Sequence, residues 1–186
     1  MMIDTLRFGK LDVNADDIVQ FSEGLIGFSD IKRFFLVDPN DDTMILWLQS
    51  VDRPEISFPV LEPKIFKNDY VVRLSAQEMR LLKLADINKA KILSVLTIPA
   101  EISEMTANMK APIVINIENR LGRQVVLQET EYNVKTPMFK ELRVHMVTNT
   151  NMSLSKIAEA EENEEEISFE TVNISTMLPS PGVQAL

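Results

Sequence analysis

Apolar and polar residues alternate with a period of two along most of the first 130 residues. The segments with this pattern are residues 5–13, 18–21, 34–37, 44–49, 56–61 and 70–74. Turn-forming residues separate them, which is typical of short strands joined by tight connections. Two later runs, residues 92–98 and 113–117, are almost continuously apolar, as expected of strands covered on both faces. The pattern predicts a mainly β fold, a small open β-barrel-like domain of short antiparallel strands.

Turn signals also place the strands that follow. Residues 119–122, Asn-Arg-Leu-Gly, predict a turn that joins the strand at 113–117 to one at 124–128. We expect these two strands to form a hairpin. A last core strand is predicted over residues 142–147, where apolar and charged residues alternate again.

One short helix is expected near residues 75–84. Ser75 and Glu78 have the spacing of a capping box, in which the serine accepts from the third helical amide and the glutamate reaches back. Met79 and Leu82 then fall on one face of the helix. We expect this helix to cap one end of the barrel.

Length and composition limit the class of protein. A chain of 186 residues predicts one domain with an appendage, large enough to bury a core without crosslinks. There is no cysteine, which excludes disulfides and thiolate metal sites and fits a reducing cytoplasm. The first residues have neither a basic region nor an apolar stretch, so they predict no secretory signal. No run approaches the roughly 20 apolar residues that span a bilayer, and we expect a cytoplasmic protein.

The negative charge is concentrated near the carboxyl end. The net charge is −9, and residues 151–186 contribute −6 of it, which leaves −3 for residues 1–150. Six glutamates lie within residues 159–166, and such a run is usually solvated. We therefore expect a folded domain over residues 1–147 and an acidic tail over residues 148–186, disordered or weakly helical. Within the tail, residues 167–174 are alternatively a short motif that adds a strand to a sheet edge, here or on a partner.

Candidates for catalysis are few. The only histidine, His145, rules out sites that need two, and lone histidines seldom act as catalysts. The five glycines are scattered and form no phosphate-binding loop. The paired carboxylates Asp16–Asp17 and Asp41–Asp42 lie in turns, where adjacent side chains diverge. The sequence therefore predicts no enzyme, no cofactor and no metal site, with a hydrolase that uses the aspartate-rich turns as a weak alternative.

Aromatic residues are the stronger candidates for binding. Trp47 lies between two leucines and is either a core residue or an interface anchor, because tryptophan is enriched at interfaces. Phe21, Leu25, Ile26 and Phe28 lie in a loop that contains two glycines. Such a loop either plugs one end of the barrel or presents an apolar patch to a partner.

Several of these segments resemble one known family. Residues 21–28 read Phe-Ser-Glu-Gly-Leu-Ile-Gly-Phe, and residues 106–116 read Thr-Ala-Asn-Met-Lys-Ala-Pro-Ile-Val-Ile-Asn. Together with residues 47–54, 96–99 and 119–127, they resemble the FliW family of bacterial flagellar assembly factors. The resemblance covers residues 1–147, and residues 148–186 extend past the family's usual pattern.

The resemblance implies a non-enzymatic protein with a small barrel-like fold. It implies binding of flagellin and of the translational repressor CsrA, which silences flagellin messenger RNA, so that capture of CsrA relieves the repression. We expect one fold that binds the two partners competitively, and a monomer. An acidic chain suits a basic protein partner and disfavours direct binding of nucleic acid.

The residues expected to contact partners lie in three places. They are Glu23, Leu25 and Phe28 in the glycine-containing loop, Trp47, and Thr106, Asn108 and Lys110 in the turn before an apolar strand. Each also has a structural explanation, for example a left-handed turn at Asn108 or a solvated charge at Lys110. Two other functions stay open, a direct RNA-binding translational regulator and an unrelated acidic protein-binding module.

Overall fold

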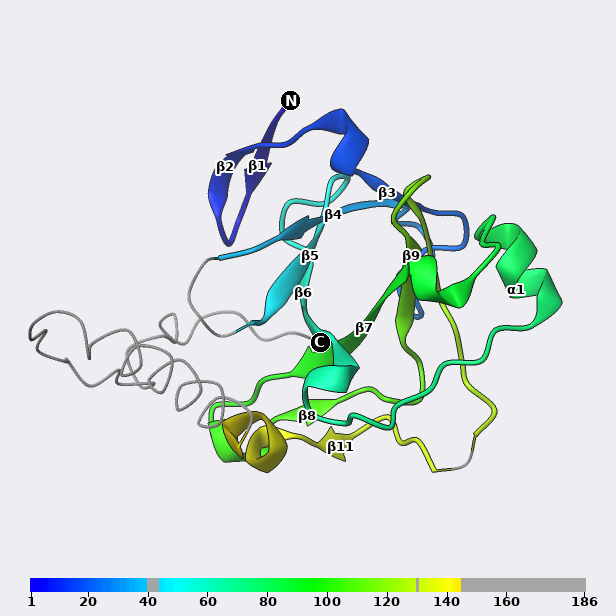
Figure 1. Ribbon diagram of the computed structural model, residues 1–186. Helices are drawn as coiled ribbons and strands as arrows, with labels where there is room; N and C mark the ends of the chain where they lie inside the picture. Colours follow the sequence, from blue (N-terminus) through cyan, green and yellow to red (C-terminus); the bar gives the residue numbers. More distant parts are fainter. Residues whose placement is uncertain (40–43, 130, 145–186) are drawn as a thin grey trace, which may run out of the picture.

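Seven strands close into a ring in the computed structural model, which describes residues 1–39, 44–129 and 131–144 (Figure 1). Around the ring, hydrogen-bonded neighbours follow the order β7-β6-β5-β4-β3-β10-β9, and β9 pairs with β7 again. The seven strands are β3 (Val19–Phe21), β4 (Arg33–Val37), β5 (Leu46–Ser50), β6 (Ser57–Leu61), β7 (Ala90–Thr97), β9 (Ile113–Asn116) and β10 (Leu121–Gln124).

The length of β7 explains why the barrel is closed. Its first half pairs with β9, for example Leu93 opposite Ile113, and its second half pairs with β6, for example Val95 opposite Val60. A single eight-residue strand therefore joins both ends of the sheet. The predicted mainly β, barrel-like fold is confirmed, with two differences: the ring is closed, and β3 and β10 run parallel.

Alternation of side chains along the strands builds two cores. One face of the strands fills the barrel with eight buried residues, among them Phe21, Phe34, Leu48 and Leu93. The opposite face of β7, β9 and β10 packs against the connecting segments, in a second core that includes Leu96, Val114 and Tyr132. Because β9 lies between the two cores, all four of its residues are buried, as its continuous apolar sequence predicts.

The remaining elements lie around the barrel. The hairpin of β1 (Met2–Thr5) and β2 (Gly9–Asp12) packs Ile3 and Val13 against Phe35 on the outside of β4. β8 (Thr106–Ala107) pairs with the end of β7, and β11 (Thr136–Pro137) pairs with β8. The short 3-10 helices are η1 (Ala15–Asp17), η2 (Pro63–Ile65), η3 (Ile87–Lys89) and η4 (Ile102–Glu104).

The predicted helix is present as α1 (Ala76–Leu81), beside the barrel in Figure 1. The capping box is confirmed: the Ser75 hydroxyl accepts from the Glu78 amide at 3.2 Å, and the Glu78 carboxylate accepts from the Ser75 amide at 2.6 Å. The helix ends three residues earlier than predicted, and Lys83 has a left-handed backbone with a φ of 52°. The Asn116 side chain donates to the carbonyls of Leu82 and Lys83, which fixes this end of the helix against β9.

Three predicted strands need correction. Residues 70–74 form no strand, because hydrogen bonds of side-chain hydroxyls hold this segment: the Tyr70 hydroxyl donates to the Met109 carbonyl at 2.7 Å, and the Val71 amide donates to the Tyr132 hydroxyl at 3.0 Å. The second hairpin strand begins at Leu121, and its register with β9 ends at Gln124. Residues 139–144 are helical, so the strand expected at 142–147 is wrong where the structure describes it. Leu142 is buried there by helical packing.

The closed end of the barrel as candidate functional site

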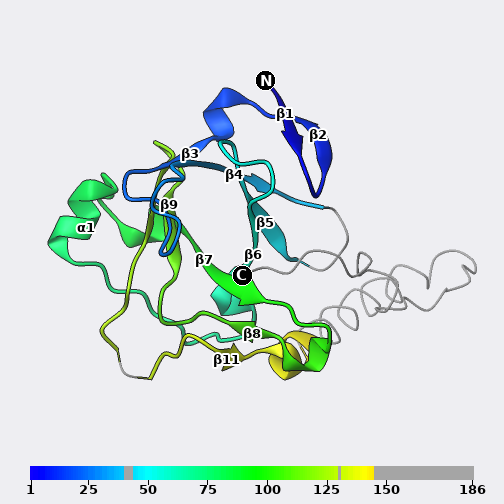
Figure 2. The same cartoon turned by 180° about the vertical axis from the view of Figure 1, so that it is seen from behind.

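The loop after β3 closes one end of the barrel. Residues 22–31, which we call the glycine loop, place Leu25 and Ile31 among the buried residues of the barrel interior. Gly24 and Gly27 have φ angles of 71° and 86°, a conformation that residues with a side chain seldom adopt. A Cβ atom on Gly24 would lie 2.4 Å from the Phe28 carbonyl oxygen, so the loop folds back on itself too tightly for any other residue. Figure 2 shows this loop, in blue, beside β3 and β9.

The glycine loop both plugs the barrel and presents apolar surface. Leu25 is buried, whereas its neighbour Ile26 is 60% exposed. Phe28 is half-buried, and its ring meets the ring of Phe58 edge to face at a centroid distance of 5.0 Å. Both alternatives left open by the sequence therefore hold, each for a different residue. Leu25 plugs the end of the barrel, and its neighbour Ile26 presents apolar surface.

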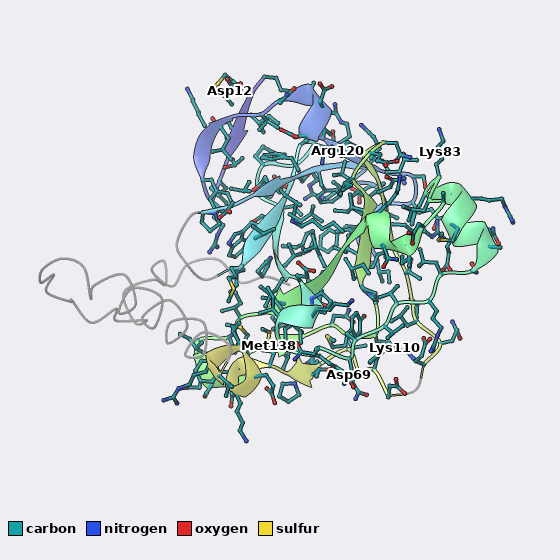
Figure 3. The ribbon with its side chains drawn as sticks, viewed as in Figure 1. Asp12, Asp69, Lys83, Lys110, Arg120 and Met138 are labelled. Carbon is teal, nitrogen blue, oxygen red and sulfur yellow. The ribbon has the colours of Figure 1, made fainter. Side chains whose placement is uncertain are left out.

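The segment before β9 is a turn held by side chains. The Asn108 side-chain oxygen accepts from the Ala111 amide at 2.9 Å, and the Asn108 amide donates to the Val95 carbonyl. Asn108 is not among the described residues with a positive φ, so the left-handed turn suggested by its sequence is wrong. The Lys110 ammonium donates to the Glu129 carbonyl at 2.6 Å, so it is tethered rather than freely solvated. In Figure 3, Lys110 lies on the opposite side of the molecule from Asp12 and Arg120.

Gln124 joins the glycine loop to this turn. Its side-chain oxygen accepts from the Ile26 amide at 2.9 Å, and its side-chain nitrogen donates to the Ala111 carbonyl at 3.0 Å. The two segments are far apart in sequence, and one amide side chain at the end of β10 forms a hydrogen bond with a backbone group of each. The sequence reasoning missed Gln124 as a site residue, although it lies within a segment that carries the family resemblance.

The predicted contact residues are only partly brought together. Glu23 lies at the closed end, where its carboxylate accepts from Arg123 of β10 at 2.7 Å. Leu25, Phe28 and Asn108 belong to the two segments that Gln124 connects. Thr106 lies farther along the sheet in β8, between Thr97 and Pro137. Within the described residues, no hydrogen bond joins Thr106 to the glycine loop.

Trp47 lies elsewhere, on the outside of β5. The Arg7 guanidinium carbon lies 3.5 Å from the centre of the Trp47 ring, and Phe8 meets that ring edge to face at 5.9 Å. Trp47 is half-buried under the turn of the β1–β2 hairpin. Burial lowers the pKa of the Arg7 guanidinium. Trp47 therefore holds the hairpin to the barrel, and a contact between it and a partner stays a prediction.

Several charged groups of the described residues form ion pairs at the surface. The Arg33 side chain donates two hydrogen bonds to one Asp52 oxygen, and these bonds lower the pKa of Asp52. Asp17 of the paired carboxylates binds Arg120 at 3.1 Å, while Asp41, Asp42 and His145 lie outside the described residues. In the part of the chain that the structure describes, no three acidic or histidine side chains gather as a metal site would require.

A family model described as FliW protein matches residues 2–138. The chain belongs to the FliW family. The flagellar assembly factor FliW of Bdellovibrio bacteriovorus is 42% identical over 154 residues, which are 83% of this chain and 88% of that protein. The flagellar assembly factor FliW of Thermoanaerobacter pseudethanolicus is 40% identical over 144 residues, 77% of this chain and 96% of that protein.

A solved FliW structure has the same architecture. This crystal structure of the flagellar assembly factor FliW matches with a TM-score of 0.70 at 32% identity. The match covers 75% of this chain and 97% of that one, so the FliW fold corresponds to the barrel described above. Among the described residues, no helix is long and apolar enough to cross a membrane.

Proposed function

We propose that this FliW-family chain binds flagellin and a CsrA-type translational repressor, and that capture of the repressor relieves repression of flagellin messenger RNA. It acts as a non-enzymatic, cytoplasmic monomer that uses no cofactor and contacts neither nucleic acid nor membrane directly. The observation that carries this proposal is the closed end of the barrel, where Gln124 holds the glycine loop and the turn before β9 in one arrangement.

Two physical properties of the closed end suit a protein partner. Its segments are fixed by hydrogen bonds and packing before any partner arrives, which reduces the entropy lost on binding. The exposed side chain of Ile26 lies in the same loop as the Glu23–Arg123 ion pair, an arrangement of apolar centre and polar rim that is common at interfaces. The net charge of −9 favours encounter with a basic partner such as an RNA-binding repressor.

The proposal is tested with purified partners. Ile26→Asp is expected to weaken binding of flagellin or of the repressor by about tenfold or more, because it places an unpaired charge in an apolar contact. The midpoint of thermal unfolding should stay unchanged, since Ile26 is exposed. Phe28→Ala is less informative, because Phe28 also packs on Phe58.

The matched control is Val134→Asp, which adds the same charge at an exposed valine elsewhere, 59% exposed in the described structure. The control should leave both affinities unchanged. Unaltered affinity of Ile26→Asp for both partners would remove the closed end from the proposal. Competition is measured separately, by calorimetric titration of the repressor complex with flagellin, and simultaneous binding without loss of affinity would disprove it.

A further inference from the structure

Beyond β10 the chain stays extended along the turn that precedes β9. The amide of Val125 donates to the Pro112 carbonyl and the amide of Leu127 to the Lys110 carbonyl, each at 2.9 Å. Val125 and Leu127 are buried, whereas Val126 between them is 51% exposed, the alternation of a strand. Residues 124–128, which we call the exposed edge, therefore continue the sheet and are paired on one side.

The other side of the exposed edge offers free backbone donors. Every second amide of a strand points toward the same neighbour, so the amides of Gln124 and Val126 point away from the segment that binds Val125 and Leu127. β3 is the neighbour of β10 on that side, and their register ends at Gly122. No hydrogen bond within the described residues reaches the Gln124 or Val126 amide. A row of unpaired amides is a template for another strand.

Apolar surface lies next to these donors. The Gln124 side chain holds the amide of Ile26, so the glycine loop lies against the first residue of the exposed edge. Ile26 and Val126 are both more than half exposed. An added strand would therefore gain main-chain hydrogen bonds and apolar contacts together.

We propose that residues 167–174 of the same chain dock on the exposed edge as an added strand. Their sequence, Ile-Ser-Phe-Glu-Thr-Val-Asn-Ile, is rich in β-branched and aromatic residues and contains neither proline nor glycine. In a strand Ile167 and Phe169 share one face, which would lie over Val126 and Ile26. This docking site is independent of the partners proposed above.

The length of the chain permits this contact. Val144 is the last described residue, and 22 residues separate it from Ile167. Fully extended, such a connection spans about 75 Å, whereas a domain of this size has a radius of gyration of roughly 15 Å. The connection also makes docking intramolecular, so a weak strand is presented at an effective concentration of about millimolar.

Disulfide trapping in the full chain tests the proposal. The chain has no cysteine, so the pair Val126→Cys with Phe169→Cys introduces the only two thiols. Under mild oxidation at low protein concentration, this pair should form an intramolecular disulfide at least about tenfold faster than a pair without docking. The matched control combines Phe169→Cys with Val134→Cys, another exposed valine. Equal rates in the two pairs would overturn the proposal.

Hydrogen exchange gives a second readout that needs no cysteine. The Val126 amide should exchange at least about tenfold more slowly in the unaltered chain than in Phe169→Asp, because docking would protect it. Exchange of Val126 that is fast in both chains would show that nothing covers the edge. Protection that increases with protein concentration would place the segment on a second copy and would overturn docking within one chain.

Discussion

At the scale of single residues, the glycine loop depends on two positions with the same backbone conformation and different surroundings. Gly24 and Gly27 both have positive φ angles. A Cβ on Gly24 would meet backbone atoms of Phe28, Ser29 and Ile31 within 3 Å, whereas one on Gly27 would meet nothing within 4 Å. Backbone atoms cannot move aside as a flexible side chain can. A substitution at Gly27 therefore costs only the free energy of the left-handed backbone, whereas one at Gly24 adds the free energy of a steric clash.

Gly27→Ala is expected to lower the free energy of unfolding by about 1–2 kcal/mol, the cost of a left-handed residue. Gly24→Ala should cost a further 1–3 kcal/mol or so, because it overpacks the loop as well. Urea denaturation of the two variants measures the difference. Equal losses would mean that the loop relaxes around the new methyl group at Gly24.

Gln124 is the second residue on which the closed end depends. Gln124→Met keeps the length of the side chain and removes both of its hydrogen bonds, at an expected cost of about 1–2 kcal/mol in the free energy of unfolding. The control is Gln128→Met, since Gln128 is exposed and, among the described residues, its side chain bonds only to the nearby Val126 carbonyl. A similar loss in both variants would show that the bridge to Ile26 and Ala111 adds no stability.

At the scale of elements, the β1–β2 hairpin is a separate two-stranded sheet that depends on packing against the barrel. A lone hairpin is only marginally stable in water, so its contacts with β4 and β5 decide its position. Ile3 and Val13 pack near Phe35, and Arg7 and Phe8 cover Trp47. The single tryptophan of the chain therefore reports on this contact.

Arg7→Ala is expected to shift the fluorescence of Trp47 to longer wavelength, because removal of the guanidinium exposes the ring to water. The lost cation–π contact should lower the free energy of unfolding by about 0.5–1 kcal/mol. Lys10→Ala changes a charge in the same hairpin away from the ring and serves as the control. An unchanged emission spectrum in Arg7→Ala would contradict the observed stacking.

At the scale of the whole molecule, the Arg33–Asp52 pair links stability to pH. Arg33 also donates its backbone amide to Asp52, so this carboxylate binds β4 through three donors. These bonds lower the pKa of Asp52 below its value in the unfolded chain. The pair therefore stabilises the fold above the unfolded pKa of about 4, and this contribution is lost as the pH falls through the lower folded pKa.

Asp52→Asn is expected to reduce the free energy of unfolding by about 1 kcal/mol at pH 7, where the carboxylate is partly screened by solvent. The difference between the variant and the unaltered chain should narrow as the pH falls from about 4 through the lower folded pKa of Asp52, because the carboxylate is then protonated in the folded chain as well. Urea denaturation at pH 7 and pH 3 tests this. A difference that stays constant with pH would show that the carboxylate charge is not what binds Arg33.

Sequence patterns of a few residues correctly predicted the elements that are stabilised by interactions between residues close in sequence. The strand expected at residues 34–37 is β4, and the capping box of Ser75 and Glu78 forms as written in the sequence. Residues 70–74 have the alternation of a strand, yet the segment is held by the bond from its own Tyr70 hydroxyl to Met109 and by the bond from its Val71 amide to the distant Tyr132 hydroxyl. The candidate site was found in part, because glycines and aromatics mark the loop, whereas the bridge by Gln124 depends on contacts across the chain.

The sequence by itself determined that the chain is mainly β, that a capped helix begins after Ser75, and that a glycine-containing loop carries large apolar residues. These properties follow from periodicity, capping and backbone preference, which act over a few residues. Only the tertiary structure decided that β7 closes the barrel, that Trp47 lies under Arg7, and that Ile26 and not Leu25 faces solvent. Each of these depends on which distant segments meet, and periodicity along the chain does not specify that pairing.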